Sequence, residues 1–183
     1  RIFEMTIQDL RPFMKRLGGQ DSVAALALRF LILTVARSGE VLGAMWQEID
    51  LGAKVWIVPA SRMKASREHR MPLSEPSFAL LEKLAGARSG PFIFAGQKQG
   101  RPLSNMALEM LLRRMSVEVT VHGFRSTFRD WAGDRTDFPR EIVEAALAHV
   151  IGDKAERAYR RGDALEKRRE LMEAWAAFLE CAS

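Results

Sequence analysis

Residues 121–133, "VHGFRSTFRDWAG", contain side chains that could bind and act on a phosphate group. His122 and Arg125 are three residues apart, so a helix that begins near His122 would place both on one face of its first turn. That end of a helix also has free backbone N–H groups and the positive end of the helix dipole, which together favour an anion. The same pattern is compatible with an ordinary capped helix that has an exposed arginine, so both interpretations stay open at this point.

A second stretch, "AHVIGDKAERAYRRGD" at residues 148–163, contains the only tyrosine of the chain, Tyr159, ten residues after His149. A phenol can act as a nucleophile, but with an ordinary pKa near 10 only about a thousandth of it is ionised at neutral pH. Nearby arginines would lower that pKa by favouring the phenolate, and His122 could accept or relay the proton. An amphipathic surface tyrosine is the alternative interpretation.

Two further cations stand beside predicted elements. Arg37 follows an apolar helix and precedes Glu40 by three residues, so it could clamp a phosphate or interact with the helix carbonyls. Lys64 lies in a predicted hairpin loop, and a lysine that can lose its proton suits the protonation of a departing sugar hydroxyl. With Arg125, Arg37 would give two guanidinium forks to hold the charge that develops on an attacked phosphodiester.

The elements that must position these side chains are mostly helical. Apolar periodicity and capping residues, among them Thr6 with Asp9, Asp21 or Ser22, and Ser104, predict the following helices: about 6–17, 22–36, 40–45, 74–84, 105–115, 122–133, 139–148, 153–160 and 166–180. The runs "KVWIVPA" and "REHRMPLS" are β-rich and contain prolines, which predicts short or edge strands joined by the basic loop "SRMKAS". A short extended segment, "PFIFAG", is also expected. The fold class is therefore mainly α with a small antiparallel β-sheet of three strands or fewer.

Composition narrows the possible functions. An apolar fraction of 48% suits one domain with a real core, and a formal charge of +5 with a pI near 9.8 makes nucleic acid a reasonable partner. The lone Cys181 cannot form an internal disulfide, and the longest apolar run is too short to span a bilayer and contains Arg29. No carboxylate cluster has metal-like spacing, which disfavours a two-metal nuclease, so we expect no metal or other cofactor.

Taken in order, these residues resemble the catalytic domain of the tyrosine recombinases, the phage integrase family, and are most similar to integrases of prophages and genomic islands. The resemblance covers nearly the whole chain and is carried by four stretches: "RSGEVLGAMWQEID", "IVPASRMKASREHRMPLS", "VHGFRSTFRDWA" and "LAHVIGDKAERAYRRGDALEKRRELMEAWAAFLE". Residues 1–183 are thus expected to form an integrase catalytic domain. Because the chain starts at Arg1 without an initiator methionine, we expect a fragment that lacks the N-terminal DNA-binding domain of the family.

The resemblance implies a role for each matched residue. The catalytic set would be Arg37 and Arg125 as phosphate clamps, Lys64 as the loop lysine, His122 as the first histidine, His149 at a position filled by His or Trp, and Tyr159 as the nucleophile. Glu40 matches the supporting acidic residue that follows the first arginine. The expected DNA contacts are Arg62, Arg67 and Arg160. Three side chains have other interpretations: His149 could instead cap a helix, Arg129 is expected to pair with an acid, and His69 is taken as structural or DNA-facing.

The implied reaction is site-specific DNA recombination, as in the integration of a prophage or viral genome, through a 3'-phosphotyrosyl intermediate. The implied partners are double-stranded attachment sites, three further protomers in a homotetramer on DNA and accessory DNA-bending proteins, with a monomeric free fragment. The place of action would be the bacterial cytoplasm, at the nucleoid. Two alternatives remain: a type IB topoisomerase-like activity and a non-catalytic DNA-binding remnant.

The predicted helix 166–180 has an apolar face made by Leu171, Met172, Trp175, Phe178 and Leu179. In the family such a terminal helix often docks on a neighbouring protomer. Docking within the same chain is the equal alternative, and the sequence does not choose between the two.

Overall fold

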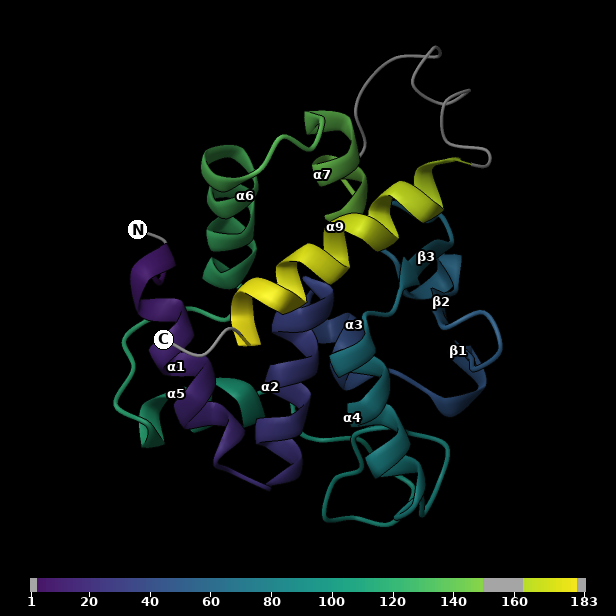
Figure 1. Ribbon diagram of the computed structural model, residues 1–183. Helices are drawn as coiled ribbons and strands as arrows, with labels where there is room; N and C mark the ends of the chain where they lie inside the picture. The colour runs from purple at the N-terminus through teal and green to yellow at the C-terminus, as the bar shows by residue number, and fades with distance from the viewer. Residues whose placement is uncertain (1–2, 150–162, 181–183) are drawn as a thin grey trace.

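The structure is a computed structural model in which residues 3–149 and 163–180 are described. Its helices, coloured along the chain in Figure 1, are α1 (Ile7–Gly18), α2 (Val23–Thr34), α3 (Ser38–Leu42), α4 (Glu75–Ala85), α5 (Ala107–Arg114), α6 (Gly123–Arg135), α7 (Arg140–Ala146) and α9 (Asp163–Glu180). Two 3-10 turns span Trp46–Glu48 and Ala60–Arg62. The predicted helix 153–160 lies outside the described residues.

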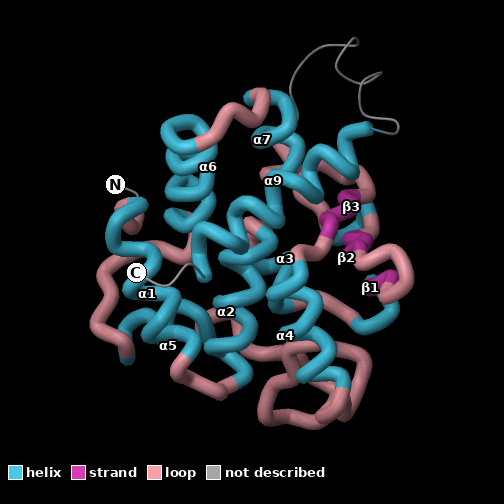
Figure 2. The backbone as a smooth tube through the Cα atoms, viewed as in Figure 1, coloured by secondary structure: helices cyan, strands magenta, loops and turns pink. Residues whose placement is uncertain are grey.

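The strands are β1 (Ile49–Asp50), β2 (Val55–Val58) and β3 (His69–Pro72), in the order β1-β2-β3 and antiparallel throughout. Val58 pairs with His69 at the end of β2, so the intervening residues 59–68 form the predicted basic loop. Figure 2 shows the three strands gathered at one edge of an otherwise helical molecule. The predicted fold class, mainly α with a small antiparallel sheet, is confirmed.

Two of the predicted helix starts are confirmed by side-chain caps. The Thr6 hydroxyl accepts from the Asp9 amide at 3.1 Å, and of the two candidates for the next helix it is Ser22 that caps, accepting from Ala25 N–H at 3.1 Å. The prediction for Ser104 is wrong. Residues 104–107 instead form a turn in which Ala107 N–H donates to the Ser104 carbonyl at 3.1 Å, so α5 starts only after Met106.

The expected extended segment "PFIFAG" pairs with its neighbours only locally. It forms no strand but two isolated bridges, between Met45 and Phe92 and between Ala95 and Pro102. Its backbone bonds go to separate partners on either side, since Ile93 N–H donates to Ala44 and Leu103 N–H donates to Phe94. The segment therefore connects two parts of the helical core and does not extend the sheet.

Helix α9 closes the core within this chain. It runs across α2 in Figure 1 and contacts α1, α2, α4, α7 and β3. The predicted apolar face is buried, with Phe178 half-buried at its edge, and Trp175 packs on Trp131 at a ring distance of 4.9 Å and on Phe128 at 5.2 Å. The Trp175 indole N–H also donates to the Ile32 carbonyl at 2.8 Å, so the ring is both packed and hydrogen-bonded.

Truncation of this ring tests how much α9 contributes to the fold. We expect Trp175→Ala to lower the free energy of unfolding by about 3–5 kcal/mol, the usual cost of removing a large buried aromatic side chain. Ala177→Ser, an exposed position on the same helix, serves as the control and should change it by less than about 0.5 kcal/mol. Urea unfolding of both variants measures the difference. Equal stability of the two would mean that α9 does not pack on its own chain in solution.

No helix in the described part of the chain is long and apolar enough to cross a membrane.

Candidate active site

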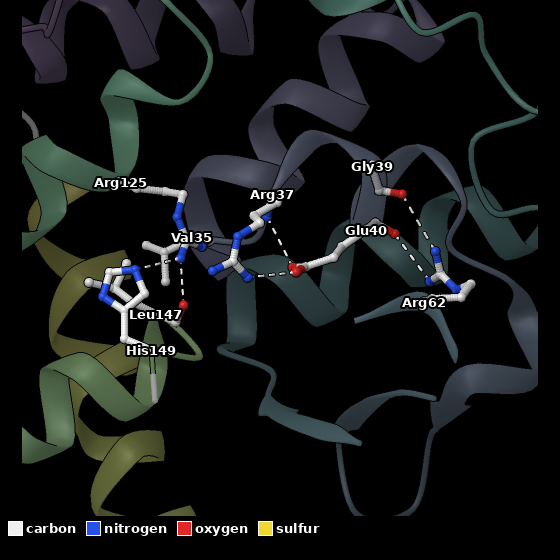
Figure 3. Close-up of polar contacts among 8 residues, drawn as sticks. All are labelled: Val35, Arg37, Gly39, Glu40, Arg62, Arg125, Leu147 and His149. Atoms are coloured by element: carbon white, nitrogen blue, oxygen red, sulfur yellow. Dashed lines mark hydrogen bonds and ion pairs between the residues drawn. The ribbon is translucent and has the colours of Figure 1, made fainter. Parts of the chain in front are cut away.

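Arg125, drawn at the left of Figure 3, contacts Val35, Leu147 and His149. It projects from the first turn of α6 and is only 4% exposed. Its Nη1 donates to the Val35 carbonyl, and its Nη2 donates to the Leu147 carbonyl at 2.5 Å. Val35 is the left-handed residue that ends α2, and Leu147 ends α7, so one guanidinium joins the ends of two helices. Nη2 also lies 3.5 Å from Nε2 of His149.

The charge on Arg125 is poorly compensated. Burial, followed by the nearby positive charge of Arg37, lowers the pKa of Arg125 to about 10, although Glu40 and Glu144 act in the opposite direction. The group therefore stays protonated at neutral pH, with carbonyls as its direct acceptors. A bound anion would relieve both the desolvation and the repulsion, which is the condition for tight phosphate binding.

Arg37 is held in place by Glu40. It is the N-cap of α3, its backbone N–H donates to Glu40 Oε2 at 3.0 Å, and its Nη1 pairs with Oε1 at 3.0 Å. The Glu40 side chain is 6% exposed while that of Arg37 is 24% exposed. The carboxylate thus fixes the arginine from the protein side and leaves part of the guanidinium open, as a supporting residue should.

His122 is exposed at the N-cap of α6, so the prediction that the helix begins there is confirmed. The pKa of His122 is lowered, first by partial burial of the ring and then by the charges of Arg125, Arg37, His149 and Lys64. Residues from four separate segments thus act on one imidazole. The tertiary structure therefore brings together the described members of the predicted set, whose catalytic roles remain predictions.

The basic loop before β3 divides its cations between two environments. Lys64 and Arg67 are exposed. Arg62 instead turns inward: its Nε and Nη2 bind Glu48 at 2.9 and 2.7 Å, and Nη2 also donates to the Glu40 carbonyl at 3.2 Å. This guanidinium anchors the loop to Glu48 and to the Glu40 carbonyl of α3. A contact between Arg62 and DNA stays a prediction.

Glu144 is a site residue that sequence reasoning missed. It is buried on α7, and its carboxylate contacts Arg129 Nε at 3.2 Å and His149 Nδ1 at 2.5 Å. The expectation that Arg129 pairs with an acid is confirmed. A carboxylate five residues before His149, across the end of a helix, was the available signal in the sequence. Tyr159 and Arg160 lie outside the described residues.

His69 brings a third imidazole to this region. It lies half-buried on β3 and lines a pocket together with Met63, Arg67, Ala148, His149 and Arg168. Burial first, then the charges of Arg168, Arg125 and Arg37, lower the pKa of His69 to about 3. The ring is therefore neutral near pH 7, as a structural residue at the edge of the site would be.

The lowered pKa of His69 has a consequence for stability. Between about pH 6.5 and pH 3 the unfolded chain binds a proton at His69 that the folded chain does not, so stability falls as pH falls through this range. We expect the free energy of unfolding to drop by about 1–2 kcal/mol more in the wild type than in His69→Gln between pH 7 and pH 5. Urea unfolding at both pH values measures this. Parallel losses in the two proteins would contradict it.

In residues 3–149 and 163–180, no group of three or more His, Cys, Asp or Glu side chains could hold a metal ion.

Known proteins are similar to this chain in sequence and in fold. The sequence model described as "Phage integrase family" matches residues 4–165. The prophage integrase IntA of Escherichia coli strain K12 is 38% identical over 155 residues, which cover 82% of this chain and 37% of that protein. The chain spans less than half the length of the curated relatives it matches.

Two solved structures share the fold at low sequence identity. A lambda integrase tetramer bound to a Holliday junction has a TM-score of 0.62 and 16% identity, over 90% of this chain and 49% of that one. The XerH site-specific recombinase bound to its difH substrate has a TM-score of 0.61 and 18% identity, over 98% of this chain and 55% of that one. At these identities the likeness supports the arrangement of elements described above.

Proposed function

This chain belongs to the phage integrase family, and from that premise we propose that it is the catalytic domain of a site-specific recombinase that cleaves and rejoins DNA through a 3'-phosphotyrosyl intermediate. One observation carries the proposal. The buried Arg125 guanidinium lies within reach of His149 and in the field of Arg37, and its direct acceptors are carbonyls. Such a site favours a phosphate, and above all a phosphate that gains charge during reaction.

The first step is binding of the scissile phosphate. Arg37 and Arg125 would donate to its non-bridging oxygens, with His149 and His122 beside them. Because Glu40 already holds the Arg37 guanidinium on its protein side, that guanidinium would lose little side-chain freedom when the phosphate binds. The residues would thus act mainly by holding hydrogen-bond donors in a geometry that exists before the reaction.

The chemical step would exchange one ester for another. The Tyr159 oxygen attacks phosphorus, its proton passes to His122 or water, and the bond from phosphorus to the 5' oxygen breaks. Lys64, exposed on its loop, would give a proton to the departing 5' oxygen, which leaves as a 5' hydroxyl. Attack by a 5' hydroxyl on the phosphotyrosyl ester reverses the step and releases Tyr159, so no external energy source is needed.

The wider assembly is also a proposal. The full-length parent would contain the N-terminal segment that clamps DNA, act as a homotetramer on its attachment sites with accessory DNA-bending proteins, and work at the nucleoid in the bacterial cytoplasm. The shared fold with a lambda integrase tetramer bound to a Holliday junction supports the proposed tetramer on DNA. Arg67, which is exposed, and Arg160 are proposed to contact the DNA backbone, and Arg62 remains a predicted DNA contact.

A suicide substrate tests the proposed function. The full-length parent, incubated with its attachment site nicked near the cleavage position, should give a protein–DNA adduct that survives denaturant. Relaxation of any supercoiled plasmid, independent of sequence, would instead favour a type IB topoisomerase-like enzyme. Tight binding without any adduct would favour a DNA-binding remnant.

A further inference from the structure

Glu144 lies behind the proposed phosphate site and touches two of its neighbours at once. Its Oε2 is 2.5 Å from His149 Nδ1, and its Oε1 is 3.2 Å from Arg129 Nε. The Glu144 side chain is 10% exposed, whereas that of Arg129 is 48% exposed. The backbone adds a further tie, because His149 N–H donates to the Glu144 carbonyl at 3.0 Å.

These contacts determine which ring nitrogen carries the proton. Glu144 is an acceptor, so Nδ1 must be protonated to bind it at 2.5 Å. Arg125 is a donor, and its Nη2 faces Nε2 at 3.5 Å, which suits an unprotonated Nε2. Arg129 Nη2 also lies 3.0 Å from Nδ1, but a guanidinium cannot donate to a nitrogen that already bears a proton, so its productive contact is with the carboxylate.

We propose that Glu144 is a positioning residue of the recombinase site: it holds the Nδ1 proton of His149 and thereby directs Nε2, and only Nε2, at Arg125 and the bound phosphate. Arg129 fixes the other carboxylate oxygen and so sets the direction of the first. The proposal rests on the proposed function, since the phosphate is the ligand that Nε2 would meet. In this arrangement the Glu144 carboxylate binds one nitrogen of the His149 ring and the phosphate would bind the other.

The Glu144 carboxylate would also compensate a positive charge on the His149 ring. To donate to an anionic phosphate oxygen, Nε2 must also bear a proton, and the ring is then a cation beside Arg125 and Arg37. Glu144 is the buried anion in direct contact with that ring. Other charged groups around His149 are Arg67, Glu68, Arg70 and Arg168, which line the neighbouring pocket, and Arg129, which is already paired. Loss of the carboxylate would therefore weaken the donor in the transition state more than in the free protein.

The matched pair of variants is Glu144→Gln and Glu141→Gln, the latter an exposed carboxylate on the same helix. In the full-length parent, we expect Glu144→Gln to slow single-turnover cleavage of the suicide substrate about 10- to 100-fold, as for other residues that orient a functional histidine. Its Kd for the attachment site should change by less than about threefold, because the arginines bind the ground state. Glu141→Gln should match the wild type in both.

A second readout does not depend on catalysis. Nitrogen-15 NMR of the His149 ring, assigned with His149→Asn, should show the Nδ1–H form in the wild type and a gain of the Nε2–H form in Glu144→Gln. If the wild type forms no adduct, the proposed function fails while this measurement still stands. If the wild type forms the adduct and Glu144→Gln changes neither rate nor tautomer, the role of Glu144 is wrong.

A third variant covers the case in which Glu144→Gln does not fold. Arg129→Gln removes the partly exposed partner of Glu144 and leaves the buried carboxylate in place. It should slow cleavage by a smaller factor than Glu144→Gln does, and it should also increase the Nε2–H form in the NMR signal. Wild-type cleavage and an unchanged ring signal in this variant would overturn the proposal.

Discussion

Replacing Tyr159 with phenylalanine is expected to abolish the covalent DNA adduct and leave DNA binding nearly unchanged. The substitution removes one oxygen, the atom that would bond to phosphorus, and keeps the ring. Without that oxygen the arginines can still hold a phosphodiester but no ester exchange can begin, so the adduct should fall by at least about a thousandfold. The measurement is the denaturant-resistant adduct on a nicked attachment site, made with the full-length parent.

The neighbouring arginines supply the control for this experiment. Arg157, two residues before Tyr159 in the sequence, is not a member of the predicted catalytic set, so Arg157→Gln should still form the adduct, with at most weaker DNA binding. Binding of Tyr159→Phe, measured on the same site, shows that the loss is chemical. An adduct that persists in Tyr159→Phe would assign the nucleophile to another residue and leave the rest of the site to be reinterpreted.

Arg125→Lys is expected to produce the second largest effect, and in two measurements at once. Lysine keeps the positive charge but has all its donors on one nitrogen, which does not reproduce the fork by which Nη1 reaches the Val35 carbonyl, Nη2 reaches the Leu147 carbonyl and the plane is offered to a phosphate. We expect cleavage to fall about 100- to 1000-fold, comparable to the loss of a donor to developing charge. The free energy of unfolding should fall by about 1–3 kcal/mol, because a buried carbonyl at a helix end loses its donor.

Arg135→Lys, an exposed position in the last turn of the same helix, is the matched control and should leave cleavage and stability unchanged. Urea unfolding of Arg125→Lys separates the two effects, because cleavage is compared only under conditions where both proteins are folded. Wild-type cleavage by folded Arg125→Lys would show that the fork at this position does not contact the reacting phosphate.

The two predictions differ in how far they depend on tertiary structure. That for Tyr159 follows from the residue type, its distance from His149 along the chain and the family resemblance. The prediction for Arg125 could be made only in part from sequence. The pattern His122-x-x-Arg125 is compatible with a phosphate contact, but by itself it fits an ordinary capped helix with an exposed arginine better. Its burial, and hence its effect on stability, became apparent only from the carbonyls at the ends of α2 and α7.

Local patterns predicted the elements wherever a local interaction decides them. Ser22 caps α2 because a serine side chain reaches the amide three residues on, and the β-rich runs on either side of residues 59–68 form the β2–β3 pair. Ser104 has the same capping chemistry, yet the helix starts later. A turn formed by the Ser104 carbonyl competes there with the cap, and propensity alone cannot rank the two.

The sequence by itself determined the family, the mainly helical class with its small sheet, and which residue types could bind and attack a phosphate. These follow from short-range periodicity and from chemistry that only a few side chains can perform. The tertiary structure decided the partners: Glu144 between Arg129 and His149, Arg62 on Glu48, and Trp175 against α2 and α6. The physical reason is that hydrogen bonds and burial depend on distances between segments. Those distances arise only when α2, α6, α7 and α9 pack into one core.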